Sequence, residues 1–452
     1  MGQRPEGGMA GGTSVETRVG DERTAQIGEA VDRLSGDLVA FLQELVRTPS
    51  LTGAEGPVQE VVARQMRTIG LETELWEPDV AMLAPYAEHV GAFEPGAFAG
   101  RPNVVGRAPG RGGGRSLTLN AHIDTVEPGD PDRWSHPPFA AEIDGDRLYG
   151  RGACDMKAGL ATHLFALAAV HAANITLAGD VTVQSVISEE DGGAGALAAV
   201  LRCGPSDGAI ITEPTRRSII AAQGGSLVFR LHVEGESAHA CVRDEGISAI
   251  ERFAAIHRAL LAYEARRNAR IDHPLYAHIT NKIPINIGVV HAGSWPSSVP
   301  EWLVAEGRAG LVPGEDLESF REAFAQEVIG AGGDDPFSQS HPPRVEWFSG
   351  QFAPAEVPED SPLVSLLRDA HAAVEGEPPP VEGATYGADM RHFLLFGDTP
   401  CVMYGAGDVR LAHHTDESIS IAEVVAATKT IALAIVNWCG TVPLDGQGFV
   451  TG

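Results

Sequence analysis

A histidine and an aspartate stand two residues apart in the segment LNAHIDTV, as His122 and Asp124. They follow the apolar run Ser116–Leu119, whose pattern predicts a buried strand. Because residues i and i+2 of a strand point to the same face, the imidazole and the carboxylate leave the strand end side by side. Such a pair can bind a metal through both side chains, or the aspartate can hold the ring while the histidine binds.

Four more segments place acidic or imidazole side chains at the ends of predicted apolar elements. These side chains are Asp155 in a glycine-rich turn, Glu189 and Glu190 after Val181–Ile187, Glu213 after a short strand, and His413 and His414 after Pro400–Tyr404. Open α/β sheets bind ligands at the carboxyl ends of their strands. Clustered carboxylates repel one another and are costly to leave unpaired, so the pattern predicts a bound cation.

The types of side chain narrow the choice of metal. Two imidazoles with several carboxylates suit Zn, Mn, Co or Fe(II) better than Ca or Mg. The count fits two ions, each with one histidine and one terminal carboxylate, and one carboxylate between them. In the doublet Glu189–Glu190, one residue can bind metal while its neighbour transfers protons. A solvated acidic turn is the alternative for this doublet, but the H-x-D and G-x-x-D-M-K segments upstream argue against it.

From about residue 23 to residue 440, the chain resembles the metallohydrolase superfamily of acetylornithine deacetylase, succinyl-diaminopimelate desuccinylase, aminoacylase and carboxypeptidase G. The resemblance is carried by six segments in order: HIDTV, GRGACDMKAG, SEEDGGAGA, TEPT, GESAHA and AHHTDE. It implies an α/β fold, in which a discontinuous catalytic domain with a mixed central sheet flanked by helices carries an inserted α+β, ferredoxin-like (βαββαβ) lid and dimerisation domain.

The resemblance also implies a role for each matching residue. The metal ligands would be His122 and Glu213 on one ion, His413 and Glu190 on the other, and Asp155 between the two. Glu189 would be the general base, and Asp124 would orient His122. The family spacing His-x-x-(Asn/Asp)-Glu selects His413 over His414, and the peptide bond after Asp155 is expected to be cis.

Residues outside the metal cluster match the family less closely. His239 corresponds to a lid histidine that reaches an active site, commonly across a dimer interface, and steadies the oxyanion. Arg308 matches an arginine that binds the substrate carboxylate, while Thr385 and Arg391 fall in a segment that departs from the compact Thr-Ser-Asp-x-Arg of relatives. These three are the predicted substrate-binding residues. A surface ion pair is the alternative for Arg308 and Arg391.

Composition limits the classes of partner. The 33 basic and 61 acidic residues give a formal charge of −28, which argues against binding to nucleic acid or anionic membranes. The five cysteines lack metal-binding spacing and are expected to be reduced, as in a cytoplasmic protein. No apolar run approaches the length of a membrane span, and no signal-peptide core is recognised.

The order of patterns predicts the organisation of the chain. Strand and helix patterns alternate up to about residue 217, change to a βαββαβ order up to about residue 350, and then resume. The predicted parts are a disordered N-terminus (1–22), a catalytic domain (23–218 and 351–442), a lid and dimerisation domain (219–350) and a C-terminal tail (443–452).

The leading hypothesis is a di-metal amidohydrolase that removes an acyl group from an N-acyl amino acid or related amine. Its cofactor would be two divalent ions, first of all Zn, with Co or Mn as alternatives. The substrate would be a small molecule, and the enzyme would be a homodimer through its lid. A metallo-exopeptidase or dipeptidase uses the same chemistry and is the first alternative. A catalytically silent binding protein is the alternative of another class.

Overall fold

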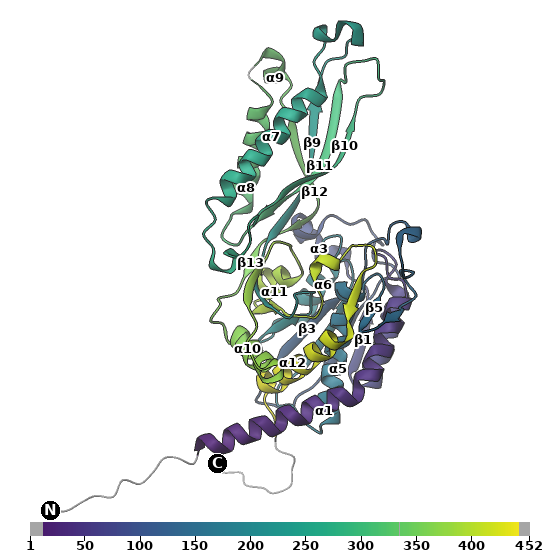
Figure 1. Cartoon of the computed structure of the whole chain (residues 1–452), viewed down its shortest axis with the longest axis vertical. Coiled ribbons are helices and arrows are strands. Elements are labelled where there is room, and N and C mark those ends of the chain that lie inside the picture. Colours follow the sequence, from purple (N-terminus) through teal and green to yellow (C-terminus); the bar gives the residue numbers. More distant parts are fainter. Residues whose placement is uncertain (1–11, 334, 443–452) are drawn as a thin grey trace, which may run out of the picture.

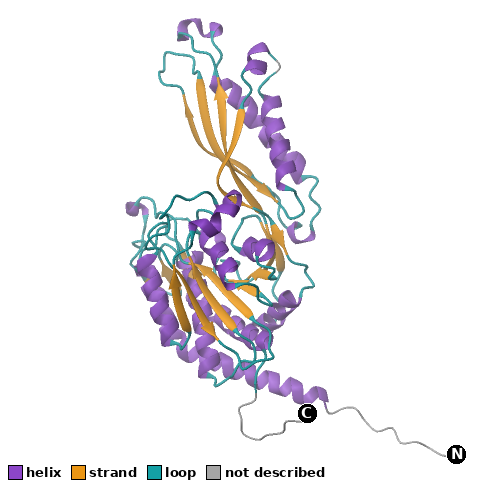
Figure 2. Ribbon diagram, turned by 180° about the vertical axis from the view of Figure 1, so that it is seen from behind, coloured by secondary structure: helices purple, strands orange, loops and turns teal. Residues whose placement is uncertain are grey.

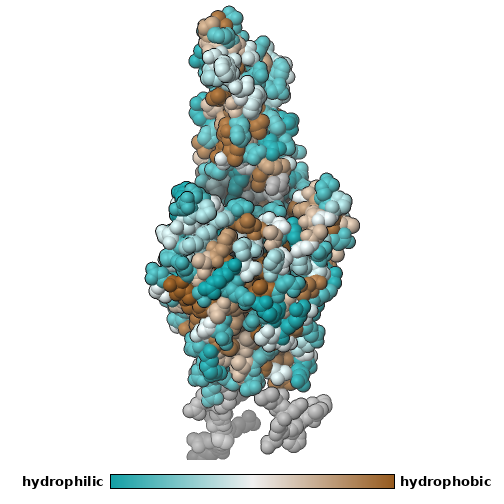
Figure 3. Space-filling view, turned by 90° about the vertical axis from the view of Figure 1, so that its right-hand side faces the viewer, coloured by the Kyte–Doolittle hydropathy of each residue, from teal (hydrophilic) through white to brown (hydrophobic). Residues whose placement is uncertain are grey.

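The computed structural model describes residues 12–333 and 335–442. The chain forms a wide lobe around a mixed sheet and a narrower lobe that projects from it (Figure 1). From the side, the narrower lobe stands as a column on the wide one (Figure 3). Each lobe has a hydrophobic core of its own, one of them built around residues such as Leu119 and Ile211 and the other around Phe229 and Phe324.

The wide lobe contains a mixed β-sheet, as predicted. Its strands are β1 (Glu72–Trp76), β2 (Asn103–Ala108), β3 (Leu117–His122), β6 (Val181–Val186), β7 (Ala209–Ile211), β8 (Ile219–Gln223), β13 (Ala355–Glu356), β14 (Val381–Ala384) and β15 (Cys401–Met403). The order is β1-β2-β6-β3-β7-β15-β8-β13, with β14 also paired to β8. Because β6, β3, β7 and β15 are parallel, their carboxyl ends share one edge of the sheet.

Helices cover both sides of this sheet (Figure 2). They are α1 (Gly12–Arg47), α2 (Gly56–Thr68), α3 (Val80–Leu83), α4 (Ala87–Val90), α5 (Ala158–Ala172), α6 (Ala194–Cys203), α10 (Pro362–Glu375), α11 (Met390–Phe396) and α12 (Ile421–Cys439). Two helical segments of the described residues, Ala153–Ala172 and α12, are long and apolar enough to cross a membrane, which corrects the prediction that none is. Their most apolar stretches are 89% and 61% buried inside the protein, as in core helices.

The narrower lobe is one four-stranded antiparallel sheet with two long helices. Its elements are β9 (Gly225–Glu234), α7 (Ala249–Asn268), β10 (Ile285–Ala292), β11 (Trp302–Leu311), α8 (Leu317–Ala331), α9 (Pro336–Ser340) and β12 (Arg344–Phe352). Apart from the short α9, this is the βαββαβ order, and the strands lie in the order β10-β11-β9-β12. Phe229, Phe320, Phe324 and Trp347 form its aromatic core.

The lobe boundary lies a few residues later than the predicted limits of 219 and 350. Strand β8 pairs with β13, β14 and β15 and therefore belongs to the wide lobe, while β12 continues to Phe352. Only Gly224 separates β8 from β9, and both strands are largely buried. Their apolar residues therefore give no sign that the chain passes from one sheet to the other.

A small third sheet pairs segments of the chain that are far apart in the sequence. It consists of β4 (Ile143–Asp144), β5 (Arg147–Tyr149) and β16 (Ser418–Ser420), in the order β16-β5-β4. Because β5 precedes the Asp155 turn and β16 follows the His413 loop, their pairing brings these two segments together.

The ends of the chain depart from the prediction in one respect. Residues 12–22 belong to α1 and are helical, whereas the sequence predicted disorder over 1–22. The segment after Gly12 has no proline, so the helix can propagate back from the apolar stripe that starts at Ile27. Residues 1–11 and the predicted tail 443–452 lie outside the described residues.

Candidate metal centre

The five predicted metal ligands converge at the carboxyl edge of the central sheet. They are His122 at the end of β3, Asp155 in the turn after β5, Glu190 after β6, Glu213 after β7 and His413 in the loop after β15. The two oxygens of Asp155 face different imidazoles. Oδ1 lies 3.0 Å from Nε2 of His122, and Oδ2 lies 3.5 Å from Nε2 of His413.

Each imidazole also has a terminal carboxylate beside it. Nε2 of His413 lies 3.0 Å from Oε2 of Glu190, and Nε2 of His122 lies 3.9 Å from Oε1 of Glu213. The neighbours are therefore the pairs that the resemblance implied, with Asp155 between them. His414 turns elsewhere, with its Nδ1 2.8 Å from the carbonyl oxygen of Thr415.

The electrostatics of the cluster fit a bound cation. Ligand atoms of His122, Asp155 and Glu190 lie within 4.8 Å of one another. Burial raises the pKa of Glu213 well above its ordinary value, and the Asp155 carboxylate raises it further. Burial likewise raises the pKa of Glu190. Three carboxylates this close strain one another unless positive charge is present, and imidazole and carboxylate together are good ligands for Zn, Mn or Co. The donor set therefore fits a divalent metal.

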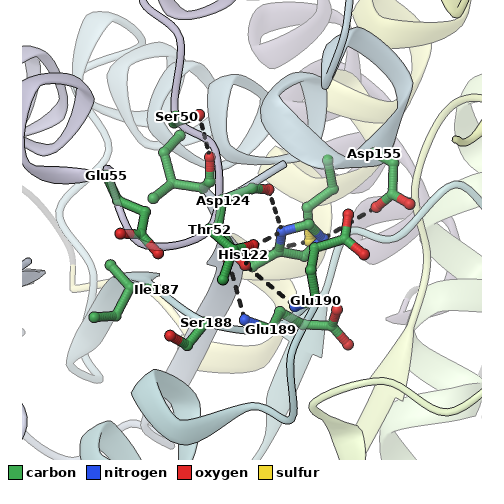
Figure 4. Close-up of polar contacts among 12 residues, drawn as sticks. Ser50, Thr52, Glu55, His122, Asp124, Asp155, Ile187, Ser188, Glu189 and Glu190 are labelled. Carbon is green, nitrogen blue, oxygen red and sulfur yellow. Dashed lines mark hydrogen bonds and ion pairs between the residues drawn. The ribbon is translucent and has the colours of Figure 1, made fainter. Parts of the chain in front are cut away.

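Asp124 holds both His122 and the acidic turn (Figure 4). Its carbonyl oxygen lies 3.0 Å and its carboxylate 3.6 Å from Nδ1 of His122. The same carboxylate accepts hydrogen bonds of 3.1 Å from the backbone N–H groups of Glu189 and Glu190, and one of 2.9 Å from the hydroxyl of Thr52. Asp124 thus positions both His122, a predicted ligand of one ion, and the backbone that carries Glu190, a predicted ligand of the other. The H-x-D spacing did not indicate the second contact.

The carboxylate of Glu417 stabilises the backbone of the Asp155 turn. One oxygen of this buried carboxylate accepts hydrogen bonds from the backbone N–H groups of Cys154 (2.9 Å) and Asp155 (3.1 Å). The other oxygen pairs with the Arg151 guanidinium at 2.6 Å. The bond Asp155–Met156 is cis, as expected. The sequence used Glu417 only as a spacing mark for His413, so its contact with Asp155 is an addition.

Glu189 lies beside the ligands in a cavity of about 360 Å³. The cavity is lined by Asp155, Glu189, Glu190, Glu213, Ser226, Val228, Arg308, Phe352, Tyr386, Gly387, Ala388, Val409, Ala412 and His413. The Glu189 side chain is only 8% exposed, and burial raises its pKa well above the ordinary value. A carboxyl group with a raised pKa next to a metal site is suited to accept and return a proton.

Arg308 is the only predicted substrate-binding side chain that lines this cavity. It comes from β11, donates a hydrogen bond of 3.3 Å to the carbonyl oxygen of Thr385, and has no partner at Nε among the described residues. Thr385 thus contacts Arg308 through its backbone and does not itself line the cavity. Tyr386, which the sequence did not single out, lines the wall next to Arg308, and burial raises its pKa well above the ordinary value.

Arg391, which the sequence predicted to bind substrate, does not line the cavity in this structure. Its side chain is fully buried and is not part of the cavity wall. The guanidinium instead donates hydrogen bonds of 2.7 Å to the carbonyl oxygens of Ala388 and Gly192. A sequence motif cannot distinguish the two roles, because an arginine two residues after an aspartate can turn toward the backbone or toward a ligand.

His239 does not reach the cavity of its own chain. Ser226, near the start of β9, lines the cavity, whereas Glu234 ends the same strand about 26 Å further on, at 3.3 Å per residue. His239 follows that far end and is exposed. Its Nδ1 lies 3.2 Å from the backbone nitrogen of Cys241 and 3.0 Å from the sulfur.

Residues 118–437 match Peptidase family M20/M25/M40. The chain belongs to this family. This M20 protein is therefore a metallohydrolase of a family that acts on amide bonds.

Curated relatives match nearly the whole chain. N-formyl-4-amino-5-aminomethyl-2-methylpyrimidine deformylase of Halalkalibacterium halodurans is 28% identical over 436 residues, covering 90% of this chain and 96% of the relative. Acetylornithine deacetylase of Myxococcus xanthus is 28% identical over 392 residues, covering 82% and 96%.

Solved structures share the fold. A tripeptidase of Staphylococcus aureus superposes with a TM-score of 0.69 and 21% identity, covering 90% of this chain and 98% of its own. A dinuclear metal binding peptidase of Bacillus subtilis gives a TM-score of 0.62 and 17% identity, covering 90% and 99%.

Proposed function

We propose that this M20 protein is a di-metal amidohydrolase that removes a small acyl group from an N-acyl amine. One observation carries the proposal: Asp155 lies between two imidazole–carboxylate pairs, and Glu189 faces the same cavity. His122 and Glu213 would hold one ion and His413 and Glu190 the other. Zn is the first candidate, with Co or Mn as alternatives, because imidazole and carboxylate suit all three.

The residues of the chain have separate tasks in the proposed reaction. When bound, the two ions activate water and polarise the amide carbonyl. Glu189 accepts the proton of the attacking water and returns it to the leaving nitrogen. Arg308, which lines the same cavity, orients an anionic group of the substrate. His239 of a second subunit would donate to the developing oxyanion.

The relatives favour a deacylase over a peptidase. The deformylase and the acetylornithine deacetylase align along most of this chain, and both names describe removal of an acyl group from an amine. An exopeptidase or dipeptidase remains the second candidate, since the tripeptidase has the same fold. A silent binding protein is disfavoured because Glu189 and the proposed ligands occupy one site.

The proposal also covers the lid, the oligomeric state and the compartment of the enzyme. The narrower lobe is a ferredoxin-like lid, supported by its βαββαβ order and the strand order β10-β11-β9-β12. It pairs two chains into a homodimer, which is supported by the distance of His239 from the cavity of its own chain. The enzyme works in the cytoplasm, which is supported by cysteines that form no disulfide among the described residues.

Metal analysis combined with a substrate panel tests the proposal. Protein reconstituted with Zn, Co or Mn should hold about two ions per chain. It should release amine from N-formyl, N-acetyl or N-succinyl compounds faster than it cleaves dipeptides. Dipeptides as the better substrates would select the second candidate. Two bound ions without turnover of any amide would favour the silent binding protein, and no bound metal would refute the proposal.

A further inference from the structure

Arg391 lies behind the acidic turn in a fully buried position. Residues Ser188 to Gly193 form this turn between β6 and α6, and it carries Glu189 and Glu190. One arm of the guanidinium donates to the carbonyl oxygen of Gly192 and the other to that of Ala388, both at 2.7 Å. A hydrogen bond from an ionised donor is about twice as strong as a neutral one, so Arg391 fastens the turn at its end.

The geometry around Gly193 makes this attachment tight. Gly193 has a φ of +77°, and a Cβ atom there would lie 2.4 Å from Nε2 of His392 and 3.0 Å from Nη2 of Arg391. The backbone N–H of Gly192 donates to the carbonyl oxygen of Glu189 at 3.0 Å. A shift of Gly192 is therefore transmitted to Glu189 through one hydrogen bond.

The flat face of the same guanidinium contacts the narrower lobe. It stacks on the ring of Phe352, with the guanidinium carbon 3.8 Å from the ring centroid. Phe352 is the last residue of β12, where the chain leaves the narrower lobe, and its side chain lines the catalytic cavity. Arg391 thus touches the turn that carries the proposed base and the strand that joins the lobes.

We propose that Arg391 is a positioning residue that sets the placement of the Glu189–Glu190 turn and couples it to the last strand of the lid. It acts through Gly192 and Phe352 and touches no substrate. The catalytic consequence rests on the proposed function, whereas the mechanical part, a turn held by Arg391, does not.

Amide hydrogen exchange in the metal-free protein tests the mechanical part. In Arg391→Met, backbone amides from Ser188 to Gly193 should exchange at least about tenfold faster, because loss of charge-assisted hydrogen bonds removes that much protection. Arg267→Met is the matched control, since Arg267 is also buried and donates to a backbone carbonyl, that of Gly310 in the narrower lobe. It should leave the turn unchanged. Equal exchange of the turn in wild type and Arg391→Met would overturn the proposal.

Kinetics test the catalytic part. Arg391→Lys keeps the charge but cannot span both carbonyls, so kcat should fall about tenfold or more while KM changes less than about threefold. Gly193→Ala retains the Arg391 side chain but displaces the turn, because the added Cβ would lie 2.4 Å from Nε2 of His392 and 2.5 Å from Oδ1 of Asp389. It should reproduce this split if Arg391→Met does not fold. A substrate-binding arginine would instead raise KM for carboxylate-bearing substrates and leave kcat and the exchange of the turn unchanged. If wild-type protein cleaves no amide, the proposed function fails, and the exchange measurement still decides the role of Arg391.

Discussion

Glu189 and Glu190 are adjacent carboxylates in one turn, yet the structure gives them different surroundings. Nε2 of His413 lies beside Glu190, whereas Glu189 lines the cavity with no side-chain partner described. We predict that Glu189→Gln keeps the metal and lowers kcat by about 10²–10⁴-fold, the usual contribution of a general base. Metal content by elemental analysis and steady-state kinetics check this outcome.

A substitution at the adjacent Glu190 should affect metal binding instead of proton transfer. Glu190→Gln should lower metal affinity, because it removes a charged ligand candidate beside His413. Asp191→Asn, in the same turn, should have only a small effect on either quantity. More than a tenth of wild-type turnover in metal-loaded Glu189→Gln would contradict the assignment of the base.

The convergence of the predicted metal ligands could be anticipated from the ends of predicted strands together with the six segments that resemble the family. His122, Asp155, Glu190, Glu213 and His413 each follow a recognisable element, and the structure brings them together. Contacts made by a side chain across the fold were not predictable. Glu417 and Arg391 reach backbone groups far away in sequence, at Asp155 and Gly192, and no periodicity records such a partner.

His163 is a buried imidazole in α5 with no hydrogen-bond partner among the described residues. Burial lowers its pKa to about 3 from an ordinary value of 6.5. Between these values the unfolded chain binds more protons, so the free energy of unfolding falls as the pH falls below 6.5, by about 1.4 kcal/mol per pH unit.

Replacing this imidazole should remove that pH dependence. We predict that the free energy of unfolding falls between pH 8 and pH 5 by about 2 kcal/mol less in His163→Leu than in wild type. Urea unfolding of metal-free protein at both pH values measures it, with the exposed His414→Leu as the control. Equal losses in wild type and His163→Leu would show that His163 is already protonated or hydrated in the folded state.

At the scale of elements, the third sheet brings together two segments of the site that are far apart in the sequence. Strand β16 pairs with β5, and Glu417, just before β16, binds the backbone of the Asp155 turn and the side chain of Arg151. We predict that Glu417→Ala lowers the free energy of unfolding by about 3–5 kcal/mol, because it leaves Arg151 buried without its partner. It should also weaken metal binding by about 10- to 100-fold through the loosened Asp155.

Unfolding curves and chelator competition measure these two effects. Glu142→Gln is a suitable control, because the pair of Glu142 with His136 lies at the surface, with side chains 49% and 24% exposed, and surface pairs contribute little. A loss below about 1 kcal/mol with unchanged metal affinity would show that Asp155 does not depend on Glu417.

The elements themselves were largely readable from the sequence. The βαββαβ order of the narrower lobe follows from periodicity that changes between 2 and 3.6 residues, and the structure has this order apart from the short α9. The strand β8 was assigned to the wrong lobe because Gly224 alone separates it from β9. Membership of a sheet depends on pairing partners, which alternation of apolar residues does not specify.

At the scale of the whole molecule, polar contacts join the two lobes near the cavity and beside it. Arg321 of α8 pairs with Glu88 of α4, and Arg308 of β11 donates to the carbonyl oxygen of Thr385 at 3.3 Å. The narrower lobe otherwise projects from the wide one (Figure 1). This geometry leaves His239 far from the cavity beneath its own lobe, so any role of this histidine in the reaction requires a second chain.

Mixing two inactive variants tests that requirement. His239→Ala lacks the lid histidine and Glu189→Gln lacks the base, so each homodimer should be strongly impaired. If His239 acts across a dimer, a mixed dimer has one complete site: the Glu189 of the first variant with the His239 of the second. A 1:1 mixture after subunit exchange should then recover about a quarter of wild-type kcat, since about half of the dimers are mixed and one site in each is complete. Activity no higher than the mean of the two variants, in a mixture shown by native mass spectrometry to contain mixed dimers, would exclude action across the interface.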